Sequence, residues 1–142
     1  MNASCLLILK LNISRLSWGF TQTQDFCSSL TKCTNLLEFD VNLAMNGVSD
    51  SGSELIAFTL GNLQALEIIS LNLEKNNLCK KGFCMLEAFN TLPCLLSFSL
   101  DIRGNHLAIE EEITKMLVKF QSNRIFRSIQ RFKIAFDEIA PS

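Results

Sequence analysis

The sequence has little proline, little histidine and almost no net charge. Its 142 residues include two prolines, six glycines and one histidine, and the formal net charge is −1 at pH 7. So few prolines and glycines leave no evident linker or low-complexity stretch, and 48% apolar residues are enough for a continuous core. We therefore expect a single domain over residues 1–142. The near-zero net charge gives no global attraction to nucleic acid or to a membrane surface.

Long apolar runs are also missing. No run approaches the roughly 18 residues of a transmembrane helix, so we expect no membrane span. The apolar segment 5–13, CLLILKLNI, is short and is interrupted by Lys10. Neither a cationic leading region nor a small-residue cleavage site accompanies it, so it does not match a secretory signal peptide. These absences predict an intracellular, cytoplasmic protein.

The six cysteines lack the spacing of a metal site. No C-x-x-C pair occurs, and one histidine is too few for a Cys/His zinc finger. We expect reduced thiols that pack as small apolar residues, with no metal and no cofactor. A bridge between loop residues that involves Cys79 stays open. The cysteines are Cys5, Cys27, Cys33, Cys79, Cys84 and Cys94.

An apolar pattern returns along the chain at a nearly fixed interval. Each copy has four apolar positions separated by three, two and two residues, and the copies begin at Leu6, Leu36, Leu66 and Leu95. In the last three copies an asparagine stands three residues after the fourth apolar position, and another apolar residue follows it. A period of about 30 residues indicates a stack of similar units. The asparagines are Asn46, Asn76 and Asn105.

Each unit predicts one strand and one helix. Residues 39–43 and 69–73 alternate apolar and polar side chains, which is typical of a strand with one buried face. After Gly52 and after Gly82, apolar residues recur at spacings of three and four, which predicts helices. Neither element can bury its apolar face alone, but stacked copies can cover one another. The apolar residues of the two predicted helices are Leu55, Ile56, Phe58, Leu60, Phe83, Leu86, Phe89 and Leu92.

The full pattern, L-x-x-L-x-L-x-L-x-x-N-x-L, resembles the leucine-rich repeat. The repeat length and helical second half are similar to the ribonuclease-inhibitor-like subtype, and residues 36–52 and 66–82 are the fullest copies. The resemblance implies a short curved α/β solenoid of four to five repeats, with a parallel sheet on the concave face and helices on the convex face. It also implies that Asn46, Asn76 and Asn105 form a structural asparagine ladder. An amide side chain has the donors and the acceptor that a turn backbone needs.

The two ends depart from the pattern. In the first unit Leu16 occupies the asparagine position, and a partial last unit begins near Ile129. We expect five strands, with a longer fourth helix before the last one. The apolar N-terminal strand has no polar capping segment before it, although an exposed edge of this kind favours unwanted pairing. Two interpretations stay open: the chain is part of a longer array, or another protein subunit covers that edge.

No residues predict catalysis. The lone His106 follows Asn105 in a surface turn, and no nucleophile or orienting partner is evident beside it. Residues 110–112, three glutamates, fall in the first turn of a predicted helix, where acidic groups complement the helix dipole. We therefore expect no catalytic residues and no enzymatic activity.

Two candidate binding surfaces remain. The first is formed by outward-facing polar positions of the predicted strands, where Asn12, Asn42, Asn72 and Asp101 would form a row roughly 15 Å long. The second is a basic C-terminal end with interleaved phenylalanines, suited to phosphates or an acidic protein surface. Either could equally be a solvated face. The concave-face candidates are Asn12, Asp40, Asn42, Ser70, Asn72 and Asp101, and the basic-end candidates are Arg124, Arg127, Arg131 and Lys133.

The sequence thus predicts a non-enzymatic protein–protein interaction module, a scaffold or accessory subunit of a larger assembly. Its partner would be another protein, which could also cover the N-terminal edge. Two alternatives remain. The chain could regulate an enzyme, as an inhibitor or as an activator of a small GTPase, or it could contact RNA through the basic end.

Overall fold

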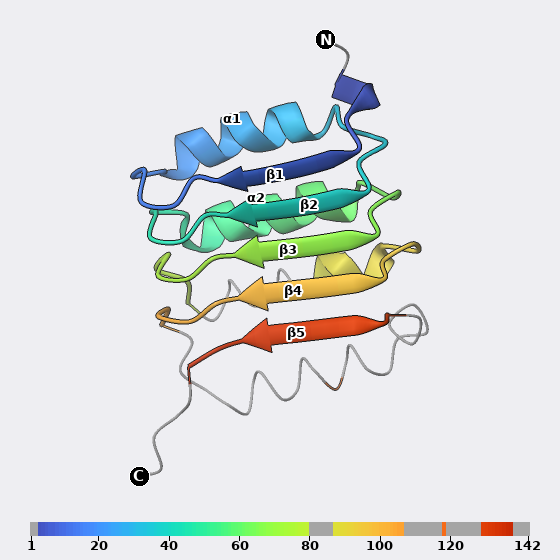
Figure 1. Ribbon diagram of the computed structural model, residues 1–142. Helices are drawn as coiled ribbons and strands as arrows, with labels where there is room; N and C mark the ends of the chain where they lie inside the picture. The colour runs from blue at the N-terminus through green and yellow to red at the C-terminus, as the bar shows by residue number, and fades with distance from the viewer. Residues whose placement is uncertain (1–2, 80–86, 107–117, 119–128, 138–142) are drawn as a thin grey trace.

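One parallel sheet organises the molecule. A computed structural model describes residues 3–79, 87–106, 118 and 129–137. The five strands lie side by side in chain order (Figure 1), which confirms the predicted α/β class and the five strands. They are β1 (Ile8–Asn12), β2 (Glu38–Asn42), β3 (Ile68–Asn72), β4 (Ser97–Asp101) and β5 (Arg131–Ala135).

The strand register follows the spacing of the apolar pattern. Val41 pairs with Leu11 on one side and with Leu71 on the other, and Leu100 pairs with Leu71 and Ile134. Because side chains alternate between the faces of a strand, this register places all inward apolar residues on one face of the sheet. The polar residues between them consequently lie together on the other face.

Two helices lie on the apolar side of the sheet: α1 (Phe20–Leu30) and α2 (Ser49–Gly61) (Figure 1). Short 3-10 segments occupy η1 (Ala3–Cys5) and residues 87–91. The helix predicted from the spacings after Gly52 is confirmed, and α2 begins three residues before that glycine, at Ser49. Of the apolar residues that predicted α2, Ile56 and Leu60 are buried, whereas Phe58 is 68% exposed on its outer side.

Two buried glycines of α2 have no room for a side chain. A Cβ at Gly52 would lie 2.8 Å from Cγ1 of Val48 and within 3.6 Å of Thr23, which is a buried residue of α1. A Cβ at Gly61 would lie 2.8 Å from the carbonyl oxygen of Ala88. The two 2.8 Å distances are shorter than van der Waals contact, so a side chain at Gly52 would clash with the N-cap residue of its own helix, and one at Gly61 would clash with the backbone of Ala88.

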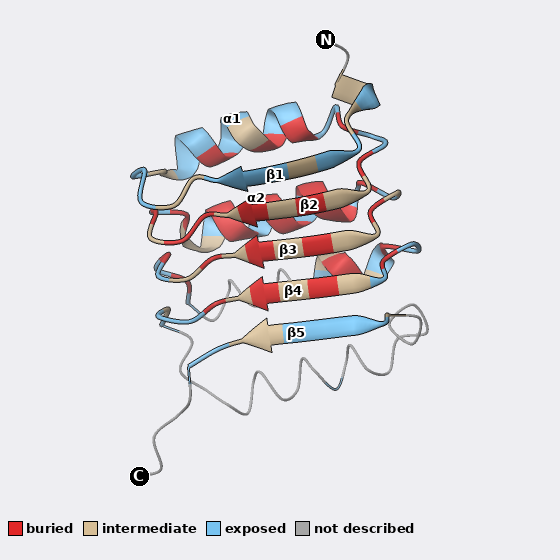
Figure 2. Ribbon diagram, viewed as in Figure 1, coloured by how far each residue is buried: buried red, intermediate tan, exposed pale blue. Residues whose placement is uncertain are grey.

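The core is densest under the three central strands. The inward residues of β2, β3 and β4 are buried, and the Phe89 ring packs at 5.0 Å from that of Phe98. Burial falls at both edges of the sheet (Figure 2). On β1 the inward Leu11 is 39% exposed, and on β5 Phe132 is also 39% exposed although its ring stacks on that of Phe98. The outer strands thus have a neighbour on one side only.

The turns that follow the strands share one backbone conformation, which the sequence alone does not display. Arg15, Met45, Lys75 and Gly104 occupy equivalent positions and all have φ between 54° and 69°. This left-handed conformation costs a residue with a Cβ about 1–2 kcal/mol. The turns therefore need compensating interactions, and buried asparagine side chains provide them.

Asn76 shows how. Its side chain is fully buried. Its Oδ1 accepts hydrogen bonds from the backbone N–H groups of Asn46 and Val48, both at 3.2 Å. Its Nδ2 donates to the carbonyl oxygens of Leu43 at 2.9 Å and Glu74 at 3.2 Å. One amide side chain thus satisfies four backbone groups and connects two successive turns.

Asn46 and Asn105 make corresponding bonds in the turns on either side. Each Oδ1 accepts from two backbone N–H groups of the preceding turn, and each Nδ2 donates to backbone carbonyls. The Oδ1 of Asn46 accepts from Leu16 and Trp18, and the Oδ1 of Asn105 accepts from Asn76 and Leu78.

Several predicted features lie outside the described residues. They include Gly82, Cys84, the three glutamates at 110–112 and most of the fourth helix predicted before Ile129. Among the helices that are described, none has the length and apolar character needed to cross a membrane.

Candidate functional site: the polar strand face

The sheet face turned away from α1 and α2 carries the polar strand residues. The register aligns them in three rows that cross the strands. We name these rows by their members. The asparagine row is Asn12, Asn42, Asn72 and Asp101; the serine row is Lys10, Asp40, Ser70, Ser99 and Lys133; and the outer row is Ile8, Glu38, Ile68, Ser97 and Arg131.

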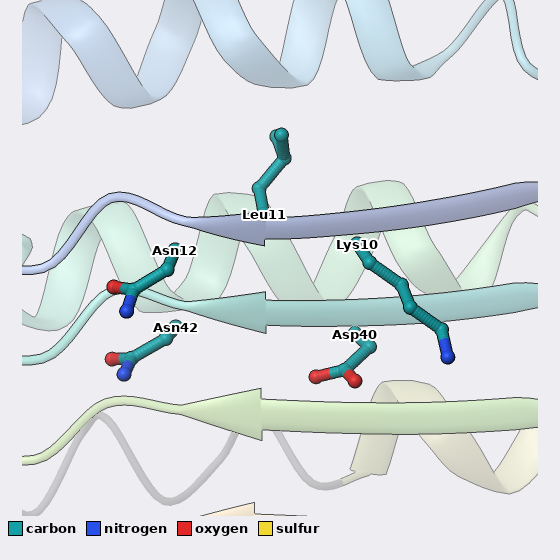
Figure 3. Close-up of a pocket in the computed structure, with 5 residues that line it drawn as sticks. All are labelled: Lys10, Leu11, Asn12, Asp40 and Asn42. Atoms are coloured by element: carbon teal, nitrogen blue, oxygen red, sulfur yellow. The ribbon is translucent and has the colours of Figure 1, made fainter.

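All six predicted residues of the concave face lie on this surface. Asp40 and Ser70 are neighbours in the serine row, and the other four form the asparagine row. Figure 3 shows that the amides of Asn12 and Asn42 lie parallel, one strand apart. Adjacent strands are about 4.8 Å apart, so the four side chains follow one another at that interval.

The asparagine row has a local structural role that sequence reasoning missed. The Oδ1 atoms of Asn42 and Asn72 each accept a hydrogen bond at 2.9 Å from the backbone N–H two residues further on. Asn12 and Asp101 make the same bond at 3.2 and 3.1 Å. These are Asx turns, which begin the bend after each strand. The signal was present in the sequence, because an Asn or Asp ends four successive strands.

The other half of each amide stays available. Within the described part of the chain, no hydrogen bond engages the Nδ2 atoms of Asn12, Asn42 or Asn72. Because the Oδ1 atoms are engaged, each amide has its orientation fixed and its N–H groups directed outward. The row therefore offers hydrogen-bond donors to a ligand, spaced by the sheet itself.

A shallow hollow lies at the β1–β2 end of this face. It has a volume of about 300 Å³ and is lined by Lys10, Leu11, Asn12, Asp40 and Asn42. The Lys10 ammonium lies 3.4 Å from a carboxylate oxygen of Glu38. Asp40 has no hydrogen bond or ion pair with any described residue, so its carboxylate is available beside the hollow (Figure 3).

Asp101 is held differently. The Arg103 guanidinium contacts both of its carboxylate oxygens, with Nε at 3.0 and 3.2 Å and Nη2 at 2.7 Å. Partial burial acts to raise the pKa of the Asp101 carboxyl. The side-chain and backbone hydrogen bonds from Arg103, and the charges of Arg103 and Lys133, outweigh burial and hold this pKa below its ordinary value.

Replacing Arg103 with glutamine is expected to raise the pKa of Asp101 toward the ordinary aspartate value of about 3.9. A depressed carboxyl pKa contributes stability above the unfolded-state pKa, and this stability is lost as pH falls through the folded-state pKa. The variant should thus lose part of the acid dependence of stability below about pH 4. A carboxyl NMR titration of Asp101 measures the shift, and the Arg15→Gln variant, in an equivalent turn, is the control. An unchanged Asp101 titration would contradict the assigned cause.

Of the four residues of the predicted basic end, Arg131 and Lys133 lie on β5 and are exposed. They point to the same polar face, in the outer row and the serine row. Arg124 and Arg127 lie outside the described residues. The sheet therefore brings part of the basic end next to the concave-face candidates, which the sequence had treated as a separate surface.

The other chemical groups have ordinary surroundings. Cys27 and Cys33 are buried, and Cys5, Cys79 and Cys94 are exposed; all five are free thiols. Burial raises the pKa of the Cys27 thiol. A hydrogen bond with Thr59 acts in the opposite direction but is the smaller effect. His106 is exposed. In the ranges that the structure describes, no group of three His, Cys, Asp or Glu side chains could hold a metal ion.

Comparison with known proteins gives no family for this chain. No protein-family model matches it, and no curated protein matches it. The function must accordingly be argued from the geometry of the polar face.

Proposed function

We propose that this chain is a non-enzymatic protein-binding module, built as a leucine-rich-repeat solenoid, that binds another protein through its polar strand face. The 29- to 30-residue spacing of the apolar pattern, the chain-order parallel sheet and the equivalent bonds of Asn46, Asn76 and Asn105 all support the repeat architecture.

One observation supports the binding surface above the others. Three amides at equivalent positions of neighbouring strands each use the oxygen internally, and no described residue hydrogen-bonds to their nitrogens. A partner would meet donors that are already oriented, so little side-chain ordering remains to oppose binding. The proposed role is that of a scaffold or accessory subunit in an intracellular assembly, with a partner that presents hydrogen-bond acceptors.

Replacing asparagine with aspartate in the asparagine row tests the effect on partner binding without disturbing the fold. The double variant Asn42→Asp, Asn72→Asp keeps both Asx-turn oxygens and removes both sets of outward donors. Two lost hydrogen bonds of about 0.5–1.5 kcal/mol each should weaken partner binding by roughly 5- to 100-fold, with an almost unchanged melting temperature. Because aspartate also adds charge, the neutral variant Asn42→Ser, Asn72→Ser should weaken binding as well.

The partner contact is measured by photo-crosslinking of the full chain. A benzophenone amino acid at Ser70 reports the polar strand face, and one at Glu54, which is exposed on α2, reports the helix side. We expect specific protein adducts from Ser70 that disappear in the double aspartate variant. Adducts from Glu54 alone, or adducts from Ser70 that the variant leaves unchanged, would rule out the proposed surface.

A further inference from the structure

The polar strand face carries opposite charges at its two ends. At the β1–β2 end, Glu38 and Asp40 face one cation, Lys10, which is paired with Glu38. At the β4–β5 end, Arg103, Arg131 and Lys133 face the carboxylates of Asp101 and Asp137. Asp101 is bound to Arg103, and Asp137 accepts a hydrogen bond from the backbone N–H of Gly104. One carboxylate, that of Asp40, and two cations, those of Arg131 and Lys133, are therefore left without a hydrogen bond or ion pair to described residues.

The serine row connects these two ends. Ser70 and Ser99 lie between Asp40 and Lys133 at successive register positions. Their side chains are small, so a ligand can approach the sheet closely there. Neither hydroxyl hydrogen-bonds to another described residue, so both can donate to and accept from a ligand. The row forms a polar floor between an acidic and a basic wall.

The spacing selects the conformation of a ligand that would contact both walls. Three strand intervals of about 4.8 Å separate Asp40 from Lys133, which gives roughly 14 Å. Four residues of extended chain, at about 3.4 Å each, cover nearly the same distance. Residues i and i+4 of an extended chain also point to the same side. In a helix, by contrast, the charges would need to lie about nine or ten residues apart.

The polar residues between the two charged ends favour a ligand with an extended backbone. An extended segment has backbone N–H and C=O groups without partners, and each must bond to something when it is covered. The hydroxyls of Ser70 and Ser99 and the amide nitrogens of Asn42 and Asn72 can meet that need. A helix satisfies its backbone internally and would leave these groups unused and desolvated.

We infer that the polar strand face binds an extended protein segment that crosses the strands, with a cationic side chain at Asp40 and an acidic side chain four residues away at Lys133. This inference rests on the proposed function and names its partner. The hollow beside Asp40, lined in part by Lys10, Asn12 and Asn42, has room for the aliphatic part of a lysine or arginine. The charges fix the position of the segment but not its chain direction.

Phage display with the full chain tests this. Three libraries of nine-residue peptides carry fixed charges at positions 3 and 7 and random β-branched or polar residues between them, which disfavours helix formation. The fixed charges are opposite in the first library, both positive in the second and both negative in the third. The wild-type chain should enrich the first library about tenfold or more over the other two, as expected for charge complementarity in an interface.

Single charge reversals make the test specific. The Asp40→Lys variant has two basic walls and should prefer the doubly negative library. The Lys133→Glu variant has two acidic walls and should prefer the doubly positive one. The matched controls are the Glu54→Lys and Lys32→Glu variants, whose reversed charges lie on the helix side, and both should keep the wild-type preference. Circular dichroism verifies folding, and Asp40→Asn serves as a milder variant if Asp40→Lys does not fold.

Two results would overturn the inference: no enrichment of the first library by the wild-type chain, or a preference that neither reversal changes. The crosslinks from Ser70 distinguish this failure from failure of the proposed function. If they persist while the peptide preference is absent, the face binds a protein of another shape. If both are absent, the face is not a binding surface.

Discussion

Replacing Asn76 with alanine is expected to lower the free energy of unfolding by about 3–5 kcal/mol. The variant would leave the backbone N–H groups of Asn46 and Val48 without a partner, and it would remove one of two donors from each of the Leu43 and Glu74 carbonyls. A buried polar group left unsatisfied costs about 1–3 kcal/mol. Two such penalties, together with a weaker loss at the two carbonyls that keep one donor each, give the expected range. Urea unfolding followed by circular dichroism measures the loss.

Two further variants show whether hydrogen bonding is the cause. Asn62→Ala removes an exposed amide that bonds only to the Phe58 carbonyl, and it should cost less than about 1 kcal/mol. Asn76→Asp preserves the size and the acceptor but places a carboxylate against two carbonyl oxygens, so it should be as harmful as alanine. A loss for Asn76→Ala no larger than for Asn62→Ala would show that the turns are not held by this side chain.

The strands and their register could be predicted because the physical rule is local. Alternation over residues 39–43 and 69–73 places one face of each strand in the core. The nearly constant offset between copies then fixes the pairing of Val41 with Leu71, since a slip of one residue would expose every inward side chain. The positions of Asn46, Asn76 and Asn105 followed from the same offset.

The missed features depend on contacts that the sequence does not display. The Asx turns divide each outward asparagine into an engaged oxygen and an unengaged nitrogen, and that division follows from backbone geometry. The alternation of apolar and polar residues over 132–136 did predict that Lys133 points outward like Ser99, and the register of β5 agrees.

Alanine at Leu71 and at Leu11 should have very different effects, although the two leucines occupy equivalent positions in the first and third copies of the apolar pattern. Leu71 is 2% exposed and lies between β2 and β4, whereas Leu11 is 39% exposed on the edge strand. Truncation of a buried leucine costs about 2–5 kcal/mol, because transfer free energy is lost and a cavity remains. We expect about 3 kcal/mol for Leu71→Ala and less than about 1 kcal/mol for Leu11→Ala. Chemical denaturation of the two variants under identical conditions measures both.

The contrast also tests whether the N-terminal edge is covered in solution. If Leu11→Ala costs as much as Leu71→Ala, the exposed side of β1 must be buried in solution, and a second copy of the chain is then the partner to test. The melting temperature would then rise with protein concentration, because association stabilises the folded state by mass action. A small loss for Leu11→Ala and a melting temperature independent of concentration would instead mean that β1 stays open. The edge strand would then remain free for another protein, while the strand face beside it binds its own partner.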